Sequence, residues 1–337
     1  MKKCLAIECS QEIKCMLHYL GTTICLKKRH IKRNRYYCSK GCRWICKQCE
    51  QNSYYIGYIY RHYNSTYSYC VCHYLKHFQI IIYYWKGNVV TLFDPITKAK
   101  KNITLSKNIN TYADSISVGN RIYIIGGYSP TSNEMNEVDF KNNSLIQKKS
   151  MLTPKCLHTL CSANDYIYSV GGYNNASISD CEKYSISKDN WKALPTLQTA
   201  RRLCAAFTFN DTLLYCLYGY NESNTNLDSM EMMSVAEYGK WEYVNVSNMY
   251  SPRWGVHGIQ ISDNEAIVFG GNIDGIECYV FCMMNGVSCK RVGDLAVSSE
   301  FYACASPAFD GSYVYDSDYN RRIHIYSIAN KKWGIVE

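Results

Sequence analysis

Cysteine and histidine side chains are concentrated near the start of the chain, where their spacing could hold metal ions. Residues 4–49 contain ten of them, namely Cys4, Cys9, Cys15, His18, Cys25, His30, Cys38, Cys42, Cys46 and Cys49. Sets of four thiolate or imidazole ligands are what a structural Zn²⁺ ion takes, and such an ion replaces the hydrophobic core that so short a segment lacks. Residues 1–50 are therefore predicted to form a small zinc-binding module with closed, non-catalytic sites.

The most regular spacing in this segment is Cys38-x3-Cys42-x3-Cys46-x2-Cys49, two close cysteine pairs separated by three residues. It resembles the second half of cross-brace zinc fingers of the ZZ, C1-like and B-box families, in which alternate pairs share one ion. The resemblance implies two structural zinc ions. Their implied ligands are Cys15, His18, Cys38 and Cys42 for one ion, and Cys25, His30, Cys46 and Cys49 for the other. Which pairs share each ion stays open, as does the alternative of free cysteines without metal.

The same segment carries the whole net charge of the chain. Residues 1–50 hold 12 Lys and Arg against 3 Glu, which makes +9, and the remaining residues sum to zero. These basic side chains could contact phosphate groups or could offset the charge of metal-bound thiolates. The second interpretation is favoured, because basic runs are often solvated surfaces. A RING finger would imply a ubiquitin ligase, but its Cys-x-His-x2-Cys centre is not in the sequence.

Motifs for catalysis are missing from the sequence. It contains no His-Glu-x-x-His, no Gly-x-Ser-x-Gly and no Gly-x-Gly-x-x-Gly that opens a helix. The histidines outside the first 50 residues are dispersed, and each is interpreted as a packed or surface residue. They are His62, His73, His77, His158, His257 and His324. We therefore predict no catalytic residues and no enzymatic activity.

Cellular location is indicated by what the sequence lacks. It has no run of about 18 apolar residues that would suggest a transmembrane helix. The first residues lead into lysine and cysteine, so we expect no secretory signal. Single cysteines scattered through strand-like segments are typical of a reduced intracellular protein. A cytoplasmic protein is expected, with the nucleus as the alternative.

A repeated pattern predicts the elements of the remaining chain. Short apolar runs ending in glycine align without gaps at residues 122–128, 167–173, 214–220 and 266–272, and degenerate copies flank them at 81–86 and 312–317. Successive copies lie 41 to 52 residues apart, the length of a four-stranded propeller blade. The pattern predicts an all-β propeller of six blades over residues 65–337, with five or seven blades left open and residues 51–64 as a linker.

Tryptophan opens the predicted fourth strand in three units, at Trp191, Trp241 and Trp333, where its ring could cover the gap between neighbouring blades. The apolar run, the Gly-Gly pair and this tryptophan together resemble the kelch repeat. One unit has Tyr218 in place of the first glycine, and the flanking copies lack both glycines. The resemblance implies a kelch-type propeller in which the glycine pairs shape the fold and carry no chemistry.

Kelch propellers with peptide ligands use the loops between the second and third strands and the loops between blades. The resemblance therefore implies Tyr128, Tyr173, Tyr220 and Asn272 from the first set, and Lys155, Arg201, Arg202, Tyr250, Arg253 and Trp254 from the second. Tyrosine, tryptophan and arginine often dominate interface energies. A ring of arginines around tyrosines would favour an acidic or phosphorylated peptide. The alternative stays open that the arginines pair with blade carboxylates such as Glu182 or Glu231.

These patterns predict a protein-interaction adaptor, with a kelch propeller that binds a protein or peptide and a zinc head for docking or oligomerisation. The alternatives are a ubiquitin ligase, or ligase substrate adaptor, with a divergent RING-like head, and a nucleic-acid-binding protein that uses the basic head. No membrane partner is expected.

Overall fold

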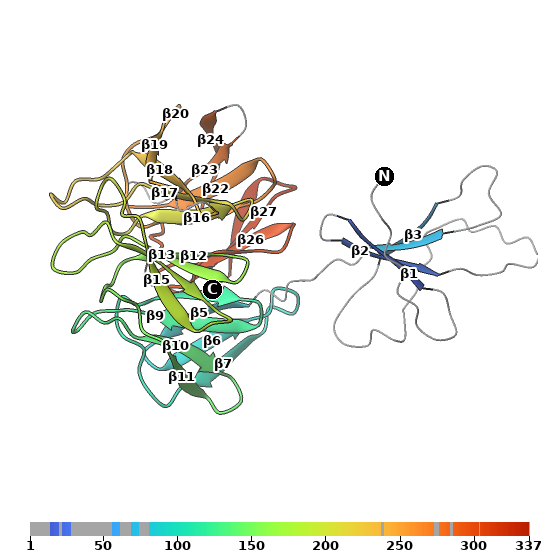
Figure 1. Ribbon diagram of the computed structural model, residues 1–337, viewed down its shortest axis with the longest axis horizontal. Helices are drawn as coiled ribbons and strands as arrows, with labels where there is room; N and C mark the ends of the chain where they lie inside the picture. Colours follow the sequence, from blue (N-terminus) through green and yellow to red (C-terminus); the bar gives the residue numbers. More distant parts are fainter. Residues whose placement is uncertain are drawn as a thin grey trace, which may run out of the picture. The chain divides into compact units, whose positions relative to one another are not determined.

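The computed structural model divides the chain into two compact units, Met1–Phe78 and Gln79–Glu337. The structure describes residues 81–336, with gaps at 237–238, 273–275, 284–285 and 303, together with the backbone of four strands in the first unit. Figure 1 shows both units. In the part of the chain that is described, no helix is long and apolar enough to cross a membrane.

The four strands of the first unit form one antiparallel sheet in the order β1-β2-β4-β3. They are β1 (Lys14–Tyr19), β2 (Thr22–Lys27), β3 (Ile56–Tyr60) and β4 (Tyr69–His73). This sheet includes residues from the predicted zinc module, the predicted linker and the first residues assigned to the propeller. The side chains of the predicted metal ligands lie outside the described residues, so the zinc module stays a prediction.

The second unit contains six sheets, which are the blades of a propeller (Figure 1). Blade 1 contains β5 (Ile82–Lys86), β6 (Val89–Phe93) and β7 (Lys100–Thr104). Blade 2 contains β8 (Asp114–Val118), β9 (Arg121–Ile125), β10 (Met135–Asp139) and β11 (Ser144–Lys148). Blade 3 contains β12 (Thr159–Ala163), β13 (Tyr166–Val170), β14 (Cys181–Ser185) and β15 (Asn190–Leu194).

Blades 4 to 6 repeat this arrangement. Blade 4 contains β16 (Ala205–Phe209), β17 (Leu213–Leu217), β18 (Met230–Ser234) and β19 (Glu242–Val244). Blade 5 contains β21 (Val256–Gln260), β22 (Glu265–Gly270), β23 (Glu277–Cys282) and β24 (Val287–Asp294), with β20 (Val246–Ser247) pairing parallel to β24. Blade 6 contains β25 (Ala308–Phe309), β26 (Tyr313–Ser317), β27 (Ile323–Ser327) and β28 (Lys332–Val336). The prediction of an all-β, six-bladed propeller is confirmed.

The glycine-ended apolar runs form the second strand of their blades, such as β9, β13 and β17. These strands read as nearly continuous apolar segments because neighbouring blades cover both of their faces; in β13, for example, four of five residues are buried. The glycines that follow are required by close contact. A Cβ added to Gly171, whose φ is +59°, would lie 2.3 Å from the carbonyl oxygen of Arg201. The glycine pairs therefore allow the loops of adjacent blades to touch.

Tryptophan side chains cover the joints between blades, as predicted. Trp191 packs with residues of blades 2 and 3, and its indole nitrogen donates to the carbonyl oxygen of Lys149 at 2.9 Å. Trp241 occupies the corresponding place between blades 3 and 4 and donates to the carbonyl oxygen of Pro195 at 2.9 Å. Each ring therefore seals its own blade against the preceding one.

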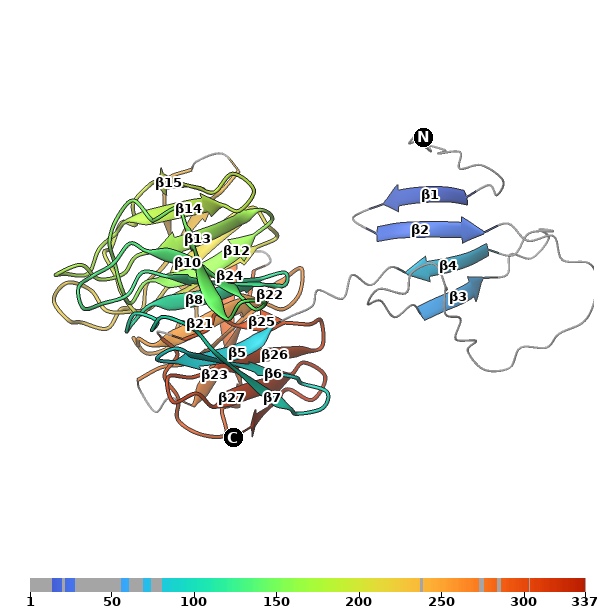
Figure 2. The same cartoon turned by 90° about the horizontal axis from the view of Figure 1, so that it is seen from below.

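The ring closes between the first and last blades. Blade 1 contains three described strands, and its strand β5 contacts β26 of blade 6 (Figure 2). Blade 2 also reaches blade 6 directly, since Ser115 bridges Ala305 in parallel and its backbone nitrogen donates to the carbonyl oxygen of Cys304 at 3.1 Å. The inner strand of blade 2 thus meets the segment that leads into the inner strand of blade 6.

A chain of backbone hydrogen bonds joins the loops that lead into the inner strands. The nitrogen of Leu157 donates to Tyr112 at 3.3 Å, Leu203 donates to Leu157 at 3.0 Å, Gly255 to Leu203 at 2.9 Å, and Phe301 to Gly255 at 2.8 Å. Tyr112, Leu157 and Leu203 adopt φ values of 53° to 55°, which are uncommon for residues other than glycine. One repeated conformation therefore ties blades 2 to 6 together at this face of the ring.

Candidate partner-binding face

Two sets of loops meet at one face of the propeller. Isolated bridges pair a residue before an inner strand with the residue after the glycine that ends an apolar run, as in Cys156 with Tyr173 and Arg202 with Tyr220. The two loop sets that the sequence resemblance implied are therefore neighbours in space. Residues on both sets can contact one bound partner.

A band of partly exposed aromatic rings crosses this face from blade 3 to blade 6. The guanidinium of Arg202 lies 5.0 Å from the ring centroid of Tyr173 and 5.3 Å from that of Tyr220. Tyr220 stacks on Trp254 at 5.4 Å, and Trp254 meets the edge of Tyr302 at 5.8 Å. Tyr302 stacks on Tyr319 at 4.7 Å. We call this set the aromatic arc: Tyr173, Arg202, Tyr220, Trp254, Tyr302 and Tyr319.

Arg202 is held in the arc by neutral partners. Its guanidinium donates to the hydroxyl of Ser177 at 2.9 Å and to the side-chain oxygen of Asn224 at 2.5 Å. Among the described residues it forms no ion pair. Its charge is therefore held in a fixed position on the surface, where a carboxylate or phosphate of a partner could reach it.

Below this face lies a second group of charged side chains, which we call the cation layer: Lys155, Arg201 and Arg253 with Glu182, Glu231 and Glu277. The ion pairs measure 3.4 Å for Lys155–Glu182, 2.6 Å for Arg201–Glu231 and 2.5 Å for Arg253–Glu277. The cationic side chains are at most 1% exposed. These three cations pair with carboxylates of the blades, which is the alternative that the sequence left open. A partner at the surface does not reach them.

The carboxylates of the cation layer also organise the loops. Glu182 accepts hydrogen bonds from the backbone nitrogens of Leu152 at 2.7 Å and Thr153 at 3.1 Å. Glu231 does the same for Gln198 at 2.7 Å and Thr199 at 3.2 Å. Each carboxylate thus stands on the third strand of one blade and fixes the loop that arrives from the preceding blade.

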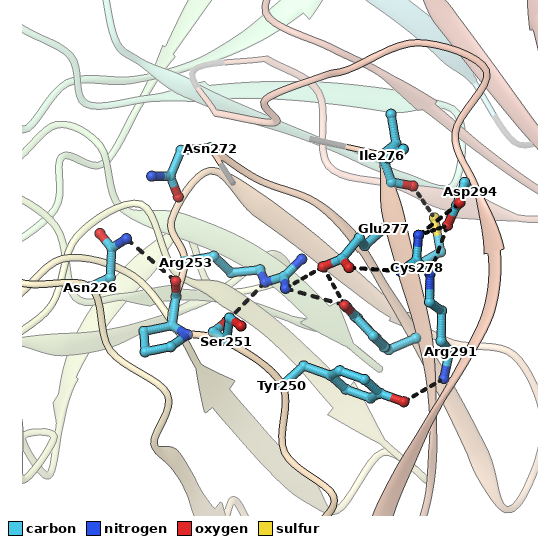
Figure 3. A network of polar contacts seen from close by, with 12 residues as sticks. Asn226, Tyr250, Ser251, Arg253, Asn272, Ile276, Glu277, Cys278, Arg291 and Asp294 are labelled. Carbon is cyan, nitrogen blue, oxygen red and sulfur yellow. Dashed lines mark hydrogen bonds and ion pairs between the residues drawn. The ribbon is translucent and has the colours of Figure 1, made fainter. Parts of the chain in front are cut away.

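Arg253 is the centre of one of these networks (Figure 3). It donates to the carboxylate of Glu277, to the Tyr279 hydroxyl at 3.2 Å and to the carbonyl oxygen of Ser251 at 3.1 Å. Arg291 reaches the other oxygen of Glu277 at 2.9 Å. Burial alone would raise the pKa of Glu277, but hydrogen bonds from Tyr279 and Arg253, with the charges of both arginines, lower it. Glu277 is therefore held ionised.

The remaining sequence-predicted residues lie at the ends of the arc or beside it. Tyr128 on blade 2 is 47% exposed and has its ring 6.4 Å from Tyr112. Asn272 accepts a hydrogen bond from the backbone nitrogen of Trp254 at 3.0 Å, so it positions that residue. Tyr250 stacks on Tyr279 at 4.0 Å, next to the cation layer rather than in the arc.

Three aromatic residues of this face were not predicted, namely Tyr112, Tyr302 and Tyr319. All three belong to blades 2 and 6 or to their loops, and the repeat is weak in blade 6, which has no glycine pair. The signal that could have located Tyr319 is its position after the second strand of blade 6, where its backbone nitrogen donates to Glu300 as that of Tyr220 donates to Arg202.

A comparison with protein-family models supports this description of the fold. The model described as the Kelch motif matches residues 154–198, which run from the loop before β12 to the end of blade 3. This propeller carries a kelch repeat. Blade 3 holds the match because it retains both glycines and the tryptophan, Gly171, Gly172 and Trp191.

Curated proteins similar to this chain include viral, plant and animal proteins. The chain is 28% identical over 149 residues to a Kelch repeat and BTB domain-containing protein 2 of cowpox virus, covering 43% of this chain and 26% of that protein. It is 27% identical over 158 residues to an F-box/kelch-repeat protein of Arabidopsis thaliana, covering 43% and 38%. Kelch-like protein 26 of Danio rerio is 27% identical over 133 residues, covering 37% and 22%. The alignments thus span only 22% to 38% of these relatives' lengths.

The interior of the propeller contains a cluster of ionisable groups away from the arc. The Nδ1 of His257 lies 2.7 Å from the carboxylate of Asp316, and Asp114 is close by; all three residues are at most 3% exposed. Burial raises the pKa of Asp114 to about 7, although the charge of His257 opposes this shift. With His158 and His324 also buried, the histidines described by the structure are packed residues rather than surface bases.

The inner strands line a small axial cavity. Its volume is about 140 Å³, and its walls include Leu160, Phe207 and Ser306 from three different blades. A pocket for a small-molecule ligand usually has a volume of about 300 Å³ or more. Within the described residues, no group of three or more Cys, His, Asp or Glu could hold a metal ion. The axial cavity is therefore smaller than a typical ligand pocket, and we take the aromatic arc as the candidate recognition surface.

Proposed function

We propose that this chain is a protein-interaction adaptor whose kelch propeller binds a protein or peptide through the aromatic arc. The observation that carries the proposal is the connected set of partly exposed rings at a single face, with one surface guanidinium among them. Rigid aromatic groups and arginine supply most of the binding energy in many protein interfaces. No enzymatic activity is proposed.

The partner would contact fewer cations than the sequence indicated. Lys155, Arg201 and Arg253 are paired inside the propeller, which leaves Arg202 as the arginine of the arc. An acidic or phosphorylated group on the partner would therefore bind at one position between blades 3 and 4. The rest of the contact would be made by aromatic rings.

Affinity purification of the full-length chain with mass spectrometry tests this function. The comparison is between the wild type, the double variant Arg202→Ala/Trp254→Ala, and Lys192→Ala as a control on the exposed surface of β15. Partners that are lost with the double variant and retained with the control support the proposal. A partner set that is the same for all three proteins contradicts it.

A second candidate is a ubiquitin ligase or a ligase substrate adaptor, because the names of the relatives combine kelch repeats with a BTB domain or an F-box. Ubiquitination assays with the purified full-length chain, a ubiquitin-activating and a ubiquitin-conjugating enzyme test for ligase activity. Autoubiquitination would favour this candidate. Its absence would leave the substrate-adaptor form, which the co-purification of ligase subunits would reveal.

We further propose that the cysteine-rich segment holds two structural zinc ions through Cys15, His18, Cys25, His30, Cys38, Cys42, Cys46 and Cys49. The spacing of the cysteine pairs supports this proposal. Elemental analysis of the purified full-length chain should find about two zinc ions per chain, and a Cys38→Ser/Cys42→Ser variant should hold about one fewer. A chain without zinc after purification in zinc-containing buffer contradicts the proposal.

A further inference from the structure

The aromatic arc has opposite charges at its two ends. Arg202 lies between blades 3 and 4, over the rings of Tyr173 and Tyr220. At the other end, Glu300 lies beside Gly255 and Tyr302, since a Cβ added to Gly255 would be 3.4 Å from the Cβ of Glu300 and 3.6 Å from the Tyr302 ring. The backbone oxygen of Glu300 also accepts a hydrogen bond from the nitrogen of Tyr319 at 3.0 Å. Glu300 is therefore part of the same surface.

Glu300 forms no ion pair with any cation in the described part of the chain. Its partial burial raises the pKa of the carboxyl, and a hydrogen bond with Tyr302 opposes this effect. A carboxylate that is partly removed from water without a cationic partner gains stability when a cation is brought to it. The arc therefore offers an acceptor for a positive charge as well as a donor for a negative one.

The region between the two charges is aromatic. Tyr220 and Trp254 stack at 5.4 Å, and Trp254 meets Tyr302 at 5.8 Å, so the rings provide continuous apolar area. The guanidinium carbon of Arg202 lies 5.3 Å from the ring centroid of Tyr220. An extended peptide advances about 3.3 Å per residue. About five residues or fewer would therefore reach from the Arg202 end to the Glu300 end.

We propose that the aromatic arc binds an extended peptide of opposite end charges, with an Asp, Glu or phosphorylated side chain at Arg202, a Lys or Arg at Glu300, and an aliphatic or proline residue over Trp254 between them. This inference rests on the proposed protein-binding function of the arc and adds the chemistry and direction of the partner. The arrangement selects against a uniformly acidic peptide, because its second acidic side chain would meet Glu300.

The test selects peptides from a phage-displayed library of random 12-residue sequences on the immobilised full-length chain. Enriched peptides should carry one acidic and one basic side chain about two to five residues apart, always in the same order, with an apolar residue between them. A synthetic copy of the best peptide is then titrated by isothermal calorimetry. Arg202→Gln and Glu300→Gln should each weaken its binding by about tenfold or more, and Lys192→Gln should not.

Charge exchange sharpens the result. The double variant Arg202→Glu/Glu300→Arg should lose the selected peptide and bind a copy in which the acidic and basic residues are exchanged. Circular dichroism of each variant identifies loss of folding, and the milder glutamine variants keep the test valid if the charge reversals do not fold.

Two outcomes distinguish failure of the opposite-charge proposal from failure of the proposed protein-binding function. Enrichment of peptides that need Trp254 but carry only acidic residues, and that bind Glu300→Gln as well as wild type, overturns the opposite-charge proposal and leaves the proposed function intact. Enriched peptides whose binding is unaffected by Trp254→Ala, Arg202→Gln and Glu300→Gln overturn both, because the arc would then not be the binding face.

Discussion

Arg201 and Arg202 are neighbours in the sequence but belong to the cation layer and the aromatic arc, respectively. Arg201 is fully buried, pairs with Glu231 at 2.6 Å, and donates to the carbonyl oxygens of Tyr218 at 3.0 Å and Ser229 at 3.1 Å. Arg202 lies over two surface tyrosine rings. Successive side chains of an extended segment point in opposite directions. A basic pair therefore reveals nothing by itself about which cation serves the fold and which is free to bind.

The largest effect on stability is expected from a substitution in the cation layer. Arg201→Met leaves the carboxylate of Glu231 buried without its cation, and the free energy of unfolding should fall by about 3–5 kcal/mol. Arg202→Met, on the surface, should change it by only about 0.5 kcal/mol. Urea denaturation followed by tryptophan fluorescence measures both.

The double variant Arg201→Met/Glu231→Leu serves as the control for this pair. Because Glu231→Leu removes the uncompensated buried carboxylate, the double variant should recover part of the stability lost in Arg201→Met, although it also loses the hydrogen bonds from Gln198 and Thr199. Equal losses for Arg201→Met and Arg202→Met would contradict the division between the two regions.

The protonation of a buried carboxyl group away from the arc can be tested through the pH dependence of stability. The folded chain keeps a proton on Asp114 up to a pKa of about 7, whereas the unfolded chain releases it near pH 4. The folded state therefore binds more protons between these values, and this group lowers stability by up to a few kcal/mol as the pH rises from about 4 to 7. Burial lowers the pKa of His158, which acts in the opposite sense.

Comparison of Asp114→Asn with wild type isolates the contribution of Asp114. Denaturation midpoints measured across this pH range should fall less steeply with rising pH in the variant. The variant also gives up one of two backbone hydrogen bonds, those from Ser115 and Leu160 at 2.9 Å each, so a uniform loss of stability is expected in addition. Parallel pH profiles would show that Asp114 does not titrate as described.

A smaller effect on stability, but a clear one on binding, is expected from Arg202→Gln. The glutamine retains a hydrogen-bonding amide and removes the charge, so partner binding should weaken by about tenfold while the denaturation midpoint stays within error of wild type. Calorimetry or quantitative affinity capture with an identified partner measures the first, and thermal denaturation the second. Unchanged binding would remove Arg202 from the proposed face.

The architecture was predictable from the sequence because the same residue pattern recurs in several blades. Glycine pairs and tryptophans located most blades, and the second strands fell where the apolar runs indicated. Burial of Lys155, Arg201 and Arg253 was not predictable from local pattern, because it depends on carboxylates 24 to 30 residues away on another strand. The recurrence of Glu182, Glu231 and Glu277 near the start of three third strands is the signal that could have favoured pairing.

Blade 6 keeps a backbone contact of the stronger units without their cation. Blades 3 to 5 have a cation before the inner strand, and blade 6 has Ser299 at this position. The carbonyl oxygen of Ser299 accepts a hydrogen bond from the nitrogen of Gly271, as that of Arg201 does from Gly172. In place of an ion pair with a cation, the hydroxyl of Ser299 donates to the carboxylate of Asp318 at 2.9 Å and lies 3.2 Å from Nε2 of His324. The same backbone contact is kept with different chemistry, which an alignment of residue types does not detect.

Two tyrosines of blade 6 provide the most direct test that the arc is the binding face. Tyr319 follows β26 and stacks in the arc, while Tyr313 begins β26 at the other end of the same strand, and both are 41% exposed. Partner binding by the full-length chain is measured for Tyr319→Ala and Tyr313→Ala. We expect about tenfold weaker binding for Tyr319→Ala and wild-type binding for Tyr313→Ala. Equal effects of the two substitutions, or a loss confined to Tyr313→Ala, would contradict it.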